Sequence, residues 1–206
     1  MPTPNKIQIP PDSTGAKLAT ETTTQGADTV HIQILKQYEP ATFIAIADRI
    51  VPAVNKYILT LFNTTATRKV VLQRAFAFNW QTAAVVGTIL ECEFRRVTAR
   101  TAGSTITPVA YDTADTLTAG ITADSTTTAV TDSSLIQRVM ATGEEVTVAA
   151  LTFASLQADS AHALFYEKKD GCKGITCRQN QGVTLKNVVG TIGTISVVFV
   201  FTDEPV

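Results

Sequence analysis

Threonine dominates this chain and restricts its choice of secondary structure. Roughly one residue in six is threonine, and valine, alanine, isoleucine and phenylalanine fill short runs between glycine, aspartate and serine. β-branched side chains have few χ1 rotamers and fit the half-buried, pleated surface of a sheet better than a helix. The composition therefore predicts a β-rich protein. Because threonine is polar but uncharged, such strands can face water or another protein without charge repulsion.

The size and hydropathy of the chain favour one domain that assembles with others. Its 206 residues suffice for one domain, and its 45% hydrophobic content suffices for a core. Only 17% of the residues are charged, which is a small share for a soluble β monomer. Since isolated domains rarely expose large apolar patches, we expect part of this surface to contact partner subunits.

Neither nucleic acid nor a membrane is expected as a partner. The net charge of -1 provides no general attraction to either. The first residues, MPTPNKIQIPPDSTGAKL, lack the apolar core of a secretory signal, and the apolar stretches are too short to span a membrane. We therefore expect synthesis in a bacterial cytoplasm.

Residues 1–30 differ in composition from the rest of the chain. They are rich in proline, threonine and glycine and contain only scattered apolar residues. Such a segment cannot bury enough surface to order itself, so it is either a disordered tail or an arm that becomes ordered on a neighbour. The alternation at Ile7 and Ile9 around a glutamine favours an extended arm, because it is typical of a strand that joins another sheet.

Residues 31–206 show the pattern of short antiparallel strands. In GTILECEFRRVTAR, Leu90, Cys92 and Phe94 share one face, and charged residues occupy the other. Similar runs recur with turn residues between them, and no convincing amphipathic helix occurs. We predict an all-β fold, an antiparallel β-sandwich or a jelly-roll-like barrel, preceded by the extended N-terminal arm.

Within this domain, residues 100–134 are polar and rich in turn-forming residues. We expect them to form a long, loop-rich surface insertion. Four aspartates in this segment are the best candidates for a calcium site: Asp112, Asp115, Asp124 and Asp132. Because their spacing matches no known calcium loop, we expect a plain polar surface and no metal site.

No arrangement of residues indicates catalysis. His31 and His162 lie in strand-like runs with polar neighbours, so both are expected to be structural. The motifs of zinc proteases, serine hydrolases, phosphate-binding loops and dinucleotide-binding folds do not occur. We therefore predict no catalytic residue and no cofactor. A pair of carboxylates brought together from distant strands stays open as an alternative.

The three cysteines are interpreted separately. Cys92 alternates with charged neighbours and is expected to be a small core residue. Cys172 and Cys177 have a loop-like spacing and no nearby histidine to complete a zinc site. A local disulfide between them is an alternative, although the lack of an export signal favours free thiols.

Basic residues concentrate at Arg95, Arg96 and Arg100. Since the net charge is near zero and no aromatic stacking platform is interleaved, we expect these arginines to contact other subunits and not nucleic acid. Glu91 and Glu93 share a strand face with Arg95, which predicts cross-strand ion pairs.

Five stretches show a family resemblance: PPDSTGAKLATETTTQGADTVHIQ, NKYILTLFNTTATRKVVLQRAFAFNWQ, LECEFRRVTARTAGSTITPVAYDTADTL, KGITCRQNQGVTLKN and TIGTISVVFVFTDEP. In them the chain resembles small virion structural proteins of tailed bacteriophages, some of which are capsid decoration (cement) or head-fibre subunits. The resemblance implies a non-enzymatic β-sandwich subunit that forms a homo-oligomer, with a trimer favoured. It also implies binding to the major capsid protein or other virion subunits on the capsid exterior.

Two other roles stay open. One is a phage tail, fibre or adaptor component. The other is a carbohydrate-binding β-sandwich module, which would stack sugars on exposed aromatic side chains. Trp80 and Tyr111 are the candidates for such stacking, but Trp80 follows an alternating strand and is expected in the core.

Overall fold

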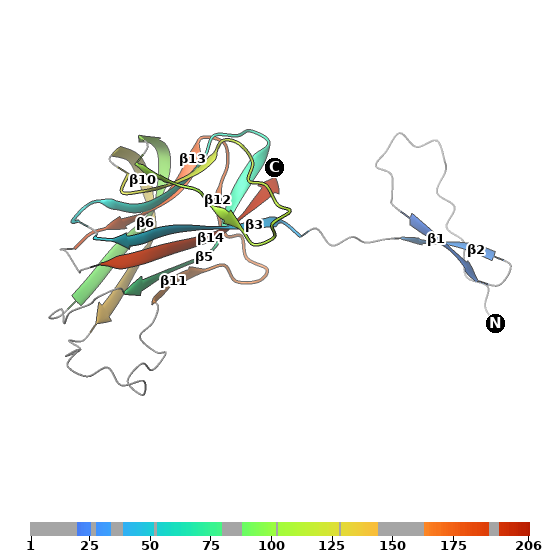
Figure 1. The fold of residues 1–206 in the computed structure, drawn as a ribbon, viewed down its shortest axis with the longest axis horizontal. Helices are drawn as coiled ribbons and strands as arrows, with labels where there is room; N and C mark the ends of the chain where they lie inside the picture. Colours follow the sequence, from blue (N-terminus) through green and yellow to red (C-terminus); the bar gives the residue numbers. More distant parts are fainter. Residues whose placement is uncertain are drawn as a thin grey trace, which may run out of the picture. The chain divides into compact units, whose positions relative to one another are not determined.

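The computed structural model describes residues 20–25, 28–33, 39–51, 53–79, 88–101, 103–127, 129–143, 163–189 and 194–206. The chain divides into two compact units, Met1–Glu39 and Pro40–Val206. Every regular element among the described residues is a β-strand, and every strand pair is antiparallel (Figure 1). The prediction of an all-β antiparallel fold is therefore confirmed.

The first unit contains a β-hairpin. Its strands are β1 (Thr20–Gln25) and β2 (Asp28–Gln33), with Gln25 opposite Asp28 at the turn. The run of threonines in β1 suits this extended backbone, because β-branched side chains favour strands. The second unit begins at Pro40, so the strand-rich region that we expected from residue 31 is divided between the units. Ile7 and Ile9 lie outside the described residues.

The second unit is a sandwich of two open sheets. Sheet 1 has the order β10 (Ala129–Gly143), β6 (Thr88–Thr101), β13 (Gln181–Asn187), β4 (Tyr57–Asn63), β9 (Ile121–Ser125) and β7 (Ser104–Ile106). Sheet 2 has the order β11 (Ala163–Glu167), β5 (Arg68–Asn79), β14 (Ile195–Pro205), β3 (Ala41–Ile50) and β8 (Val109–Ala110), and β12 (Ile175–Cys177) also pairs with β5. Because both sheets keep free edges, the sandwich is confirmed and the barrel alternative is wrong.

Aromatic and aliphatic side chains from both sheets fill the core between them. The ring centroids of Phe94 in sheet 1 and Phe199 in sheet 2 are 5.9 Å apart, and both side chains are fully buried. Cys92 is also fully buried, as the alternation in β6 predicted. In β6 and β14, alternate residues therefore point into the space between the sheets, as the period of two requires.

A β-bulge changes the core-facing residues of β5. The register with β14 skips Gln73, so one extra residue is inserted into the strand. The buried core residues of β5 are accordingly Val70 and Leu72 before the bulge and Ala75 and Ala77 after it. The extra residue therefore moves the core-facing side chains from one parity of the sequence to the other.

The segment 100–134, which we expected to be rich in loops, contains short strands separated by turns, the longest non-strand stretch being residues 111–120. It forms β7, β8 and β9 and contributes to β6 and β10. Sheet 1 places β7 and β9 at the opposite edge from β6 and β10. The end of β6 and the start of β10 nevertheless cross over β9 and β4, because Arg100 donates to the hydroxyl of Thr122 and the hydroxyl of Tyr57 donates to the carbonyl of Val130.

Hydrogen bonds fix this crossing onto β4. Thr126 N–H donates to the carbonyl of Ile58, and the hydroxyl of Thr127 donates to that of Thr60 over 3.1 Å. At Gly103 a Cβ would lie 2.4 Å from the carbonyl oxygen of Ser125. Only glycine therefore fits where the chain before β7 passes the chain after β9. Asp124 and Thr127 are therefore buried, although the polar sequence around them is typical of a solvated loop.

Candidate functional site

One edge of sheet 2 is open along part of β3. β8 pairs with residues 43 and 44 only, and no other described strand pairs with residues 45–48 on that side. Tyr111 N–H donates to the carbonyl of Thr42 over 2.9 Å, which shows that the main-chain groups of Thr42 point to this edge. Since these groups alternate sides along a strand, those of Ile46 point to the same edge.

A β-bulge ends this open stretch. Arg49 has a φ of 48°, and the β3–β14 register shifts between Ile195 and Val197. The N–H of Arg49 donates to Ser196 Oγ over 2.9 Å, and that hydroxyl donates to Asp48 over 2.6 Å. Because a bulge bends a strand and interrupts pairing, regular strand addition is restricted to residues 45–48.

Apolar side chains are exposed on β3, on β8 and in the turn that follows β3. The exposed fractions are 42% for Ile46, 59% for Val51, 46% for Val54 and 62% for Val109. Scattered exposed apolar residues are normal, but Ile46 and Val109 lie on the paired strands β3 and β8, beside an open backbone edge, which is typical of a surface that binds another chain. We call residues 45–48 and these exposed side chains the β3 edge surface.

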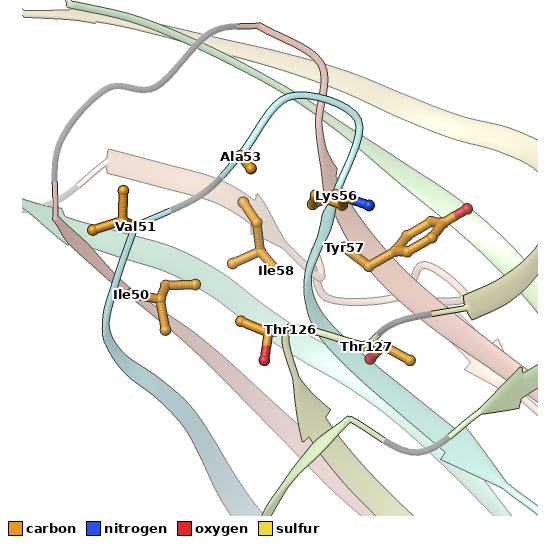
Figure 2. A pocket seen from close by; sticks show the side chains of 8 residues that line it. All are labelled: Ile50, Val51, Ala53, Lys56, Tyr57, Ile58, Thr126 and Thr127. Atoms are coloured by element: carbon orange, nitrogen blue, oxygen red, sulfur yellow. The ribbon is translucent and has the colours of Figure 1, made fainter.

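An apolar pocket lies where β3 leads into β4 (Figure 2). Its volume is about 240 Å³, and its lining residues are Ile50, Val51, Ala53, Lys56, Tyr57, Ile58, Thr126 and Thr127. Small-molecule sites usually have volumes of roughly 300–1,000 Å³. The pocket is thus small for such a ligand, and its aliphatic wall suits an apolar side chain of a partner.

Arg95 belongs to a charge network on the outer face of sheet 1. It forms ion pairs with Glu93 at 2.7 Å and with Asp132 at 2.6 Å. Arg138 on the neighbouring strand β10 pairs with Glu93 at 2.6 Å and with Glu91 at 3.3 Å. The predicted cross-strand ion pairs are confirmed. Arg95 has partners within the chain, and its contact with another subunit stays a prediction.

This network makes stability depend on pH. Hydrogen bonds from Arg138 and Arg95 hold the pKa of Glu93 below its ordinary value of 4.5. A carboxylate whose pKa is lower in the folded state adds stability above its unfolded pKa, and this stability is lost as the pH falls through the folded pKa. We expect Glu93→Gln to lose less stability than the native chain between about pH 7 and about pH 3, measured by urea unfolding. Equal losses in the two proteins would contradict this role of Glu93.

The other two arginines also have partners within the chain. Arg100 forms an ion pair with Asp124 at 2.5 Å, and its guanidinium lies 5.8 Å from the centroid of the Phe62 ring. Asp124 is only 1% exposed. Arg96 donates to the carbonyl of Thr176 over 2.5 Å. The subunit contacts that we predicted for Arg96 and Arg100 stay predictions.

The cysteines are free, so the disulfide alternative is wrong. Cys177 is buried in β12, whereas Cys172 is exposed before that strand. Burial raises the pKa of the Cys92 and Cys177 thiols to about 12. Both buried thiols are therefore protonated near neutral pH.

The structure does not bring the four candidate calcium ligands together. Asp124 and Asp132 have the arginine partners given above, and Asp112 accepts a hydrogen bond from the N–H of Ala114. In the described part of the chain, no three His, Cys, Asp or Glu side chains are placed to hold a metal ion. Tyr111 is exposed, whereas Trp80 and His162 lie outside the described residues.

Comparisons of this chain with protein-family models, curated proteins and solved structures find no match. The described segments also include no helix with the length and apolar character that crossing a membrane requires. The candidate site therefore depends on the geometry of the β3 edge surface and its pocket.

Sequence reasoning did not identify the β3 edge surface. The alternation in ATFIAIADRI predicts a strand, but it does not show that the strand lies beside a very short neighbour. The nearest signal is the apolar run at Val51 and Val54 around a proline, which cannot continue a central strand. Such a run is equally compatible with a buried turn.

Proposed function

We propose that this chain is a non-enzymatic virion structural subunit, a capsid decoration (cement) protein that assembles with copies of itself and stabilises the head of a tailed phage. The observation that carries the proposal is the β3 edge surface. Unpaired strand edges are templates for pairing with another chain, and the exposed valines and isoleucine beside this edge add apolar area to such a contact. The sequence resemblance to phage virion proteins supports the same role.

A repeating shell suits a protein of this design. A decoration subunit binds a lattice through many modest contacts, and multivalency raises its retention far above that of one site. The open stretch of β3 and its exposed apolar side chains would supply such a contact.

The first test is the oligomeric state of the native chain and of Val51→Asp. We expect the native chain to form a homo-oligomer, with a trimer favoured, and Val51→Asp to weaken it at least about 30-fold. The reason is that an unpaired charge in an interface costs about 2–5 kcal/mol. Light scattering across a concentration series measures the change.

Met140→Asp is the matched control, because Met140 is 68% exposed on β10 and lies away from β3. This variant should assemble like the native chain. A native chain that stays monomeric contradicts the proposal, and a Val51→Asp variant that assembles normally contradicts the role of the edge.

The copy number of the chain in purified virions tests the location. Quantitative mass spectrometry compares it with that of the major capsid protein. A copy number proportional to the capsid subunits supports a decoration protein. A copy number typical of a single ring or fibre would overturn the capsid role in favour of the tail.

A further inference from the structure

We infer that the occupant of the β3 edge surface is the N-terminal segment of a second copy of this chain, with residues 6–9 added as a strand beside residues 45–48. This inference rests on the proposed function, because it names the partner of the same surface. Two features that are far apart in the sequence would then contact each other: the alternating residues near the N-terminus and the open edge of β3.

The N-terminal segment contains one stretch suited to short strand addition. In PNKIQIPP, Ile7 and Ile9 alternate with polar residues, and Pro4 and Pro10 flank the stretch. Proline has no N–H to donate, and the residue before a proline favours extended backbone. Pairing is therefore limited to the residues between the two prolines. These residues, 5–9, are one residue longer than residues 45–48, which lie between the end of β8 and the bulge at Arg49, so they suffice to cover the open stretch.

The side chains of this stretch also match the surface. Ile7 and Ile9 lie on one face of an extended strand, because strand side chains alternate. The isoleucine nearer Asp48 then lies next to the aliphatic wall of the pocket, which includes Ile50 and Val51. In strand addition, main-chain hydrogen bonds supply affinity and side-chain pockets supply specificity. Here the open edge of β3 would supply the main-chain hydrogen bonds, and the apolar pocket would bind a side chain.

A donated segment fits better than pairing of β3 with β3 of a second copy. Self-pairing about a two-fold axis would leave the pocket unfilled, and its ladder would stop at the bulge after a few residues. Donation from one copy to the next is a heterologous contact, which closes into a ring when the rotation allows. A ring is compatible with the trimer that the sequence resemblance implies.

Disulfide trapping between two full-length variants tests the inference. Both carry Cys172→Ser to remove the exposed thiol, while Cys92 and Cys177 stay buried with a pKa of about 12. One variant adds Ile7→Cys or Ile9→Cys, and the other adds Val51→Cys. In the mixture we expect a covalent dimer of the two different chains, formed at least about tenfold faster than with a control site, because association raises the effective concentration of the thiols. The more reactive of positions 7 and 9 reports the strand direction.

The control partner carries Met140→Cys on β10, an exposed position on a different edge strand. Equal trapping at Val51→Cys and Met140→Cys overturns the inference. So does a disulfide formed within one monomeric chain that carries both cysteines. Light scattering of the same proteins separates the two proposals. An oligomer without specific trapping overturns only the arm contact, whereas a monomer overturns the proposed function as well.

Discussion

Replacing Arg100 with alanine is expected to lower the free energy of unfolding by about 3 kcal/mol or more. The reason is the burial of Asp124, which is 1% exposed and pairs with Arg100 at 2.5 Å. Removing one partner of a buried ion pair leaves an uncompensated charge, which typically costs about 3–5 kcal/mol. The hydroxyl of Thr105, 3.5 Å from the carboxylate, is too distant to replace the guanidinium. Urea unfolding of the purified variant measures the loss.

Two further variants make this prediction specific. Arg178→Ala removes an exposed arginine and should change the free energy of unfolding by less than about 0.5 kcal/mol. Arg100→Met combined with Asp124→Leu replaces both charges with apolar groups and should recover much of the lost stability. A loss below about 1 kcal/mol for Arg100→Ala would show that the pair contributes little to the fold. Arg100 would then be better explained by a contact with another subunit.

The second large effect is expected for Phe199→Ala, which should lower the free energy of unfolding by about 3–5 kcal/mol. Phe199 is fully buried and its ring stacks on that of Phe94 from the opposite sheet. Truncation removes the transfer free energy of the ring and leaves a cavity that the two sheets cannot close without moving together. The free energy of unfolding from urea titration, compared with the native chain, gives the magnitude.

A double-mutant cycle connects this effect to the packing of the sheets. Phe94→Ala with Phe199→Ala should cost less than the sum of the single variants, because the two rings are in contact and share one cavity. Met140→Ala, at a side chain that is 68% exposed, should have nearly no effect. Strict additivity of Phe94→Ala and Phe199→Ala would contradict the stacking across the core.

Substitutions in the β3 edge surface, in the Arg100–Asp124 ion pair and in the core are expected to change different measured properties. Changes at Val51 are expected to alter assembly and leave unfolding nearly unchanged, because that side chain is 59% exposed. Changes at Arg100 or Phe199 are expected to alter unfolding first. Measuring both properties for each variant therefore separates a surface used by partners from residues that hold the sandwich together.

The amino-acid sequence by itself determined the strands and much of their orientation. In β14 the alternation of Ile195, Val197, Phe199 and Phe201 predicts a strand with one core-facing row, and that row is buried. In β6 the same period predicts the buried Cys92 and Phe94. Alternation predicts the core-facing residues here because adjacent side chains of a strand point to opposite faces. Which face is buried can therefore be read from the order of apolar and polar residues along the strand.

Only the tertiary structure decided which strands are neighbours and which polar groups are buried. The bulge at Gln73 exchanges the faces of β5, and the short length of β8 leaves residues 45–48 open. The crossing over β4 buries Asp124 and Thr127, although residues 100–134 resemble a solvated loop in the sequence. These features depend on pairing between residues far apart in the chain. A local pattern contains the period of a strand, but not the identity of the strand or side chain that will lie beside it.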